Sequence, residues 1–416
     1  MVDVVELATE DREAAEARLR DTPSLATETP WHALVFGEAD AVARALAAGA
    51  IAPAVAGGPL HAVPLVYACF SRFAQPDTPR TAGILAIARR LLALGADPNA
   101  SFETPQYPGN PFPVLYGATG YNDNPALATL LLDAGASPSD DESLYHSTEH
   151  EDLACVRLLL ARGARVHANT LKHMLDRESI EGVRLLLDGG ADPAATNRRG
   201  ETALHWAIWR GRSADIVRLL VARGAPIEAR RIDDRTAFAL AILFGRDAQA
   251  AALRDAGADA TVSEVDRYLA EYAHADANGA PFPAPPVLTA ADAHLLPDLA
   301  DAGHAAGVRA LLAAGAGVNE RGEHGATALH FACWRGADAL VAPLLARGAD
   351  TTVEDTTFKA TPAGWLLHGA RFCQEPRGDY AAALRALLAA GVAVVTHDPT
   401  GRPEVDAILR ARGLLT

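Results

Sequence analysis

The chain has 416 residues, of which 50% are hydrophobic, and its formal net charge is −15. This hydrophobic content is enough to bury a large core. The acidic charge has the wrong sign for binding the phosphates of nucleic acid or an anionic membrane surface. Composition therefore excludes nucleic acid and membranes as expected partners.

Targeting and redox signals are weak. The first residues, MVDVVELATEDREAAEARL, lack the basic and apolar regions of a signal peptide, and nowhere do 18 apolar residues run together. The four cysteines lie far apart and form no CxxC pair: Cys69, Cys155, Cys333 and Cys373. We therefore expect a soluble, cytoplasmic protein with no disulfide or zinc framework and no cofactor.

A short signature recurs along the chain after an initial pair of predicted helices in residues 2–20. The signature is L-L-x-x-G-A, and its glycines are Gly95, Gly135, Gly163, Gly190, Gly224, Gly257, Gly315, Gly348 and Gly391, with a looser match at Gly49. Each glycine follows an amphipathic segment. We expect each to end a helix in the left-handed conformation.

Two stretches before residue 150 depart from this pattern. FETPQYPGNPFP, at residues 102–113, predicts a long proline-rich finger. His146 to His150 spell HxxEH, which in inverzincin metallopeptidases gives two zinc-binding histidines and a glutamate base on one helical face. One hypothesis is therefore a metal site with His146 and His150 as ligands and Glu149 as the catalytic base. The third ligand would come from the next repeat, where the possible ligands are His173, Glu178 and Glu181. A polar, histidine-lined pocket is the alternative, and the short repeat favours it.

Two later segments are close copies of one another. They are GETALHWAIWRGRSADIVRLLVARGAPIEA, at residues 200–229, and GATALHFACWRGADALVAPLLARGADTTVE, at residues 325–354. Both resemble the ankyrin consensus G-x-T-P-L-H, and the glycine steps from 190 to 224 to 257 are 34 and 33 residues, as the ankyrin period requires. The resemblance implies an all-α ankyrin-repeat solenoid of about ten helix-turn-helix units with N- and C-terminal caps, and few or no strands.

The step from Gly257 to Gly315 is 58 residues, which is too long for one unit. We expect a truncated unit there with one helix from Ser263 to about His274, followed by the proline-rich crossing GAPFPAPP at residues 279–286. Thr289 and Asp292 form a helix-start pattern that reopens the stack. The expected domains are N-terminal repeats at 1–262, the truncated repeat and crossing at 263–288, and C-terminal repeats at 289–416, closed by a half-repeat at 401–413. We expect the crossing to interrupt stacking and to be the least ordered internal stretch.

The second helices should stack through their leucines. We expect near-complete burial of Leu219, Leu220, Leu311, Leu312, Leu344 and Leu345. The histidines of the T-x-L-H motif, His205 and His330, are structural in the family, where they form hydrogen bonds between repeats.

Ankyrin proteins bind through a concave groove, and the resemblance assigns its contact positions to the ends of the first helices. Those positions hold Trp209, Arg210, Trp334, Arg335, Tyr121 and His368, with Glu149 in a second patch beside His146 and His150. Tryptophan, tyrosine and arginine are common at binding hot spots. A competing interpretation is that the tryptophans pack between neighbouring helices.

The sequence therefore favours a monomeric module that binds a protein or peptide partner in the groove. The alternative is an enzyme or small-molecule receptor that uses the groove as a pocket, with or without a metal at the HxxEH segment. No P-loop, GxGxxG or GxSxG motif supports catalysis.

Overall fold

The computed structural model describes residues 4–103, 109–373, 378–394, 396 and 398–415. The chain divides into two compact units, Met1–Ala195 and Thr196–Thr416. The expected boundaries at 262 and 288 thus fall inside the second unit. Whether the proline-rich crossing acts as a hinge stays a prediction.

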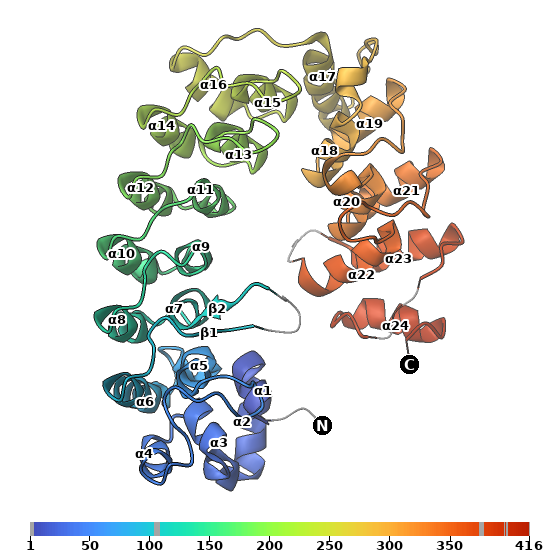
Figure 1. Ribbon diagram of the computed structural model, residues 1–416. Coiled ribbons are helices and arrows are strands. Elements are labelled where there is room, and N and C mark those ends of the chain that lie inside the picture. Colours follow the sequence, from blue (N-terminus) through green and yellow to red (C-terminus); the bar gives the residue numbers. More distant parts are fainter. Residues whose placement is uncertain (1–3, 104–108, 374–377, 395, 397, 416) are drawn as a thin grey trace. The chain divides into compact units, whose positions relative to one another are not determined.

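The first unit is a succession of helix pairs (Figure 1). The expected N-terminal helix pair is confirmed, because α1 packs against α2 and α3. Its elements are α1 Val4–Glu10, α2 Arg12–Asp21, η1 Pro23–Thr27, α3 Pro30–Val35, α4 Ala39–Ala47, α5 Pro64–Phe70, η2 Arg72–Ala74, α6 Thr81–Ala93, β1 Ser101–Phe102, β2 Phe112–Pro113, α7 Val114–Tyr116, η3 Gly117–Tyr121, α8 Pro125–Asp133, α9 Ser143–Ser147, α10 Ala154–Ala161, α11 Ala168–Met174 and α12 Ile180–Asp188.

The second unit continues the same pattern around one unpaired helix. Its elements are α13 Ala203–Trp209, α14 Ala214–Ala222, α15 Ala237–Leu243, α16 Asp247–Asp255, α17 Glu264–Asn278, η4 Ala290–Asp292, α18 Leu295–Asp301, α19 Ala305–Ala313, η5 Glu323–Gly325, α20 Ala328–Trp334, α21 Asp338–Ala346, α22 Pro362–Phe372, α23 Tyr380–Ala389 and α24 Pro403–Ala411. Helix α24, packed on α23, is the expected closing helix.

The described residues contain almost no strands, as expected. The proline-rich finger starts and ends in β1 and β2, which pair antiparallel with Ser101 opposite Pro113 and Phe102 opposite Phe112. Within the described residues this two-stranded ribbon is the whole sheet content. Residues 104–108 of the finger lie outside the described part of the chain.

The signature glycines end helices as predicted. Each of the ten has a positive φ, between +68° and +102°, a conformation that costs glycine little and other residues more. The two helices of a repeat are short: α13 spans seven residues and α14 spans nine. Isolated helices of this length are unstable in water, so packing against neighbouring repeats stabilises them.

The core follows one position of the signature. The residue four before each glycine from Gly95 onward is a leucine with no measurable exposure: Leu91, Leu131, Leu159, Leu186, Leu220, Leu253, Leu311, Leu344 and Leu387. Burial of Leu312 is also confirmed. The prediction was wrong for Leu219 and Leu345, which are half-buried. Adjacent helical residues are about 100° apart, so only one leucine of each of these pairs lies at the centre of the buried stripe.

The stack passes through the truncated unit on a single helix. Ser263 caps α17 by accepting a hydrogen bond from the Asp266 N–H (3.0 Å), and α17 packs against α15 on one side and α19 on the other. Residues 280–289 then form neither helix nor strand. Phe282 of this crossing stacks on Tyr272 of α17, with ring centroids 4.2 Å apart. The expected break in helical structure is confirmed. The expected interruption of stacking is wrong, because α17 contacts helices from both sides.

Candidate functional site

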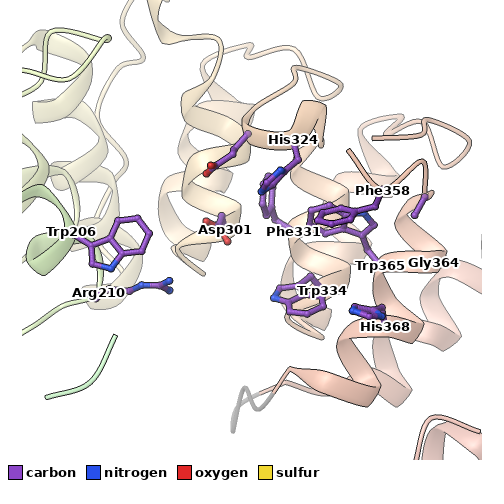
Figure 2. Close-up of a pocket in the computed structure, with 12 residues that line it drawn as sticks. Trp206, Arg210, Asp301, His324, Phe331, Trp334, Phe358, Gly364, Trp365 and His368 are labelled. Atoms are coloured by element: carbon purple, nitrogen blue, oxygen red, sulfur yellow. The ribbon is translucent and has the colours of Figure 1, made fainter. Parts of the chain in front are cut away.

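An aromatic-lined cavity lies inside the second unit and is built by first helices. Helices α13, α18, α20 and α22, together with the loops before α20 and α22, enclose about 600 Å³. Figure 2 shows Trp206 and Arg210 on one side of this cavity and Trp334, Trp365 and His368 on the other. The full lining is Trp206, Arg210, Asp301, Glu323, His324, Phe331, Trp334, Phe358, Ala360, Gly364, Trp365 and His368. We call this the aromatic cavity.

One wall of the aromatic cavity is a packed group of rings. Trp365 meets Phe331, Phe358 and Trp334 edge to face, with centroids 5.4, 5.9 and 6.4 Å apart. His368 stacks on Trp334 at 5.5 Å. Edge-to-face and stacked pairs of this kind are favourable beyond the apolar area they bury. The wall is therefore preformed.

A buried carboxylate holds Trp365 in place. The indole Nε1–H donates to Asp355 (3.0 Å), which also accepts from the backbone N–H groups of Thr357, Phe358 and Ala360. Burial raises the pKa of Asp355, but the hydrogen bonds outweigh it and lower the pKa to about 2. Asp355 is therefore ionised under all ordinary conditions and fixes both the ring and the loop before α22.

Several charged residues surround Asp301, which lies in the cavity wall at the end of α18. Its carboxylate is half-buried, and burial raises its pKa to about 6, although Arg210 and Arg335 act in the opposite direction. Glu323 and Asp298 raise it further. The two arginines of the repeated Trp-Arg motif thus act on the same carboxylate from two different repeats.

The structure separates the four residues predicted from the Trp-Arg motif. Arg210 and Trp334 line the aromatic cavity, whereas Trp209 and Arg335 do not. Trp209 instead packs against Phe244, and the Arg231 guanidinium lies 5.6 Å from its ring centroid. In the cavity its place is taken by Trp206, over whose ring Arg210 lies at 4.8 Å. All four predicted side chains are half-buried.

A buried ion cluster lies next to this site. Asp298 of α18 pairs with Arg199 and with Arg231 (2.9 Å), and Arg235 pairs with Asp266 of α17 (2.7 Å). These ion pairs connect the repeat loops before the proline-rich crossing to the helices on either side of it. His294 reaches Asp233 of the same cluster at 3.1 Å, and with Arg231 and Arg235 it lowers the pKa of that carboxyl against the effect of burial.

The sequence-predicted residues of the first unit are paired within the protein. Tyr121 donates its hydroxyl hydrogen to the Thr9 carbonyl, and Arg72 lies 3.5 Å over its ring. His146 contacts both Glu149 (2.8 Å) and Glu142 (3.2 Å), and His173 stacks on Tyr145. These contacts bring histidines and carboxylates together, and the polar, histidine-lined pocket stays a prediction.

The structure does not support the hypothesis of a metal site at the HxxEH segment. Helix α9 ends at Ser147, so His146 and His150 do not share a helical face. His150 directs Nε2 to the Gly120 carbonyl (2.8 Å) instead. In the part of the chain that the structure describes, no three His, Cys, Asp or Glu residues are grouped to hold a metal ion.

The structural role of the T-x-L-H histidines is confirmed. His205 Nδ1 accepts from the Thr202 N–H, and its Nε2 bonds to the carbonyl of Arg235 in the next repeat (3.3 Å). His330 does the same with Thr327 and Ala360. Burial lowers the pKa of His205 to about 4, since desolvation penalises the charged ring.

Sequence reasoning missed Trp206, Trp365 and Asp301. Trp206 lies one position after the motif histidine, and in the other copy that position is Phe331, so two large rings at one register were a usable signal. Trp365 occupies the first helix of the next repeat. Asp301 had no motif, and packing of α18 against α20 brings it to the cavity.

Comparison with known proteins assigns the repeats to a class. A model described as ankyrin repeats (3 copies) matches residues 171–264, and one described as ankyrin repeat matches residues 324–356. Residues 171–264 and 324–356 are therefore ankyrin repeats, and ankyrin repeats are generally modules of protein–protein interaction.

Two proteins of known sequence or structure are similar to part of this chain. Protein PhlB of Serratia liquefaciens is 44% identical over 78 residues, which are 18% of this chain and 34% of that protein. The chain thus matches about a third of that relative's length. The solved human ASB11 ankyrin repeat domain is 20% identical, covers 56% of this chain and 99% of its own, and superposes with a TM-score of 0.44. Among the described residues no helix is long and apolar enough to cross a membrane.

Proposed function

We propose that this protein is a binding module that recognises a protein or peptide partner, and that the aromatic cavity of residues 196–416 is its principal contact site. The observation that carries the proposal is the cavity itself. First helices, the elements that place the groove residues in the family, supply five rings to its lining: Trp206, Phe331, Trp334, Trp365 and His368. Rigid aromatic rings and arginine dominate hot spots because they give large contact area at low entropic cost.

The proposal revises the predicted contact set. Trp334, Arg210 and His368 keep their predicted role, and Trp206 replaces Trp209. Arg335 acts through Asp301, whose pKa it lowers. On the first unit, Tyr121 remains a candidate contact and Glu149 remains a candidate in the second patch, although both side chains already have partners within the protein.

Size supports a side-chain anchor. Ligand pockets typically measure about 300–1,000 Å³, so about 600 Å³ holds one large side chain together with its neighbours. Phe358 is 62% exposed at the edge of the cavity, where it would meet the flanking residues of an extended partner.

The test is partner capture with matched variants. The tagged full chain, Trp334→Ala and Leu94→Ala are compared for proteins retained from a lysate of the native host. Leu94 is 55% exposed in the first unit and serves as a control for losing an exposed apolar side chain. We expect Trp334→Ala to lose at least 90% of the partner that Leu94→Ala retains, with melting temperatures measured for all three. Equal retention by both variants would refute the proposal.

A further inference from the structure

We propose that the aromatic cavity selects a cationic side chain, lysine or arginine, carried on a basic peptide segment of the partner. This inference rests on the proposed function and adds the chemistry of the occupant. It follows from three features of the cavity: the ring walls, the carboxylates in them, and the cation that they already hold.

The ring walls suit a positive charge. Five large aromatic side chains line the cavity: Trp206, Phe331, Trp334, Phe358 and Trp365. The face of an aromatic ring carries partial negative charge and attracts ammonium and guanidinium groups within about 6 Å of the centroid. The protein uses this attraction itself, since the Arg210 guanidinium lies 4.8 Å from the centre of Trp206.

Carboxylates outnumber cations in the lining. Asp301 and Glu323 line the cavity together with one guanidinium, that of Arg210, and Arg335 acts on Asp301 from outside the lining. Burial and the Arg371 charge lower the pKa of His368, which disfavours its charged form. Burial raises the pKa of Asp301 to about 6, so its carboxylate is ionised but poorly solvated at neutral pH. A poorly solvated carboxylate gains more from a nearby cation than an exposed one does.

The scale of the site favours a peptide over a free cation. A cavity of about 600 Å³ is larger than a guanidinium group, and Phe358 of its lining is 62% exposed, so flanking residues of a peptide could contact this ring. The net charge of −15 attracts basic segments at long range and repels acidic ones. A basic segment is therefore complementary both to the carboxylates of the cavity and to the net charge of the chain.

The experiment titrates the purified full chain with a pentapeptide of arginine flanked by glycines, blocked at both ends, and follows tryptophan fluorescence and calorimetric heat. The matched peptides carry citrulline, the neutral isostere, or glutamate. We expect arginine to bind about five- to thirtyfold more tightly than citrulline, in line with measured cation–π strengths. Equal affinity for arginine and citrulline, or preference for glutamate, would overturn the inference.

Two charge variants locate the effect. Glu323→Gln should weaken arginine binding about two- to fivefold and leave citrulline binding unchanged. Glu354→Gln makes the same charge change at an exposed residue that does not line the cavity, and it should have less effect. If both variants weaken binding equally, only the general charge matters and the inference fails. Both residues are exposed, so both variants should fold.

Other outcomes separate the inference from the proposed function. Ethylguanidinium binding as tightly as the arginine peptide would point to a small free cation and overturn the peptide as occupant. Capture of a partner that depends on Trp334 but ignores Glu323 would leave the proposed function standing and remove the cation. Selective arginine binding without Trp334-dependent capture would support the cation as occupant and contradict the proposed function.

Discussion

The two copies of the G-x-T-A-L-H repeat, at residues 200–229 and 325–354, place the same motif in different surroundings. Trp334 lines the aromatic cavity, whereas the equivalent Trp209 lies beside Arg231 and the buried ion cluster. Arg210 lines the cavity, but Arg335 acts on Asp301 from outside the lining. The rest of the motif behaves alike in both copies: the histidine, the threonine cap and the buried leucine. The position of a residue within the repeat thus determines its backbone conformation and its place in the core. The neighbouring repeat determines which side chain of the motif lines the cavity.

The buried ion cluster lies beside the first copy, and replacing Asp298 should show how much the cluster stabilises the protein. Asp298→Ala leaves Arg199 and the almost fully buried Arg231 without their shared carboxylate. Breaking a buried pair from one side costs about 3–5 kcal/mol, which urea unfolding would measure. Asp255→Ala, at an exposed position of α16, is the control. A loss no greater than that of the control would show that the cluster does not support this repeat.

The buried leucines test whether the two repeats are equivalent in their cores. Leu220→Ala and Leu344→Ala should each cost about 2–5 kcal/mol, because both side chains are fully buried four residues before a signature glycine. Leu219→Ala should cost less, since that side chain is half-buried. Chemical denaturation of the three variants gives the comparison. Equal losses for Leu219 and Leu220 would contradict the assigned face of α14.

The motif histidine of the first copy should make stability depend on pH. The pKa of His205 is about 4 in the folded chain and near 6.5 when unfolded, so the unfolded state binds the extra proton between these values. Stability is therefore intact above pH 6.5 and falls as the pH drops toward 4. We expect His205 to contribute about 2 kcal/mol of loss between pH 7 and pH 5.

The control for this pH effect is a second histidine variant. His205→Gln should flatten the dependence of the unfolding free energy on pH, whereas His274→Gln, at an exposed position, should leave it as in the parent chain. Identical slopes in the parent chain and His205→Gln would rule out this source.

Replacing the two motif tryptophans should change the free energy least, but it compares the two repeats most directly. Trp334→Ala should weaken partner binding at least tenfold, about 1.4 kcal/mol, with a modest fall in melting temperature. Trp209→Ala should lower the melting temperature and leave the affinity of the folded protein unchanged. The measurement pairs a binding titration with thermal unfolding for each variant. The reverse pattern would exchange the roles of the two residues.

The sequence predicted the repeat class, the capping glycines and the interrepeat histidines because each depends on a few residues at fixed spacing. It predicted the helix after Ser263 for the same reason. It could not predict that Trp206 and Trp334 share a cavity, because they lie in repeats on opposite sides of a 58-residue irregular step. The HxxEH prediction failed because helix length, and not spacing, decides whether two histidines face the same way.

The unpaired helix α17 also bears on how this array arose. Tandem duplication of whole repeats adds about 33 residues and two helices at each event, which keeps first and second helices in phase. Helix α17 packs on α15, which is the first helix of its repeat, and on α19, which is the second helix of its repeat. The alternation of first and second helices is therefore interrupted at α17. Whole repeats could therefore be gained or lost on either side during evolution, but the odd helix itself records a separate event.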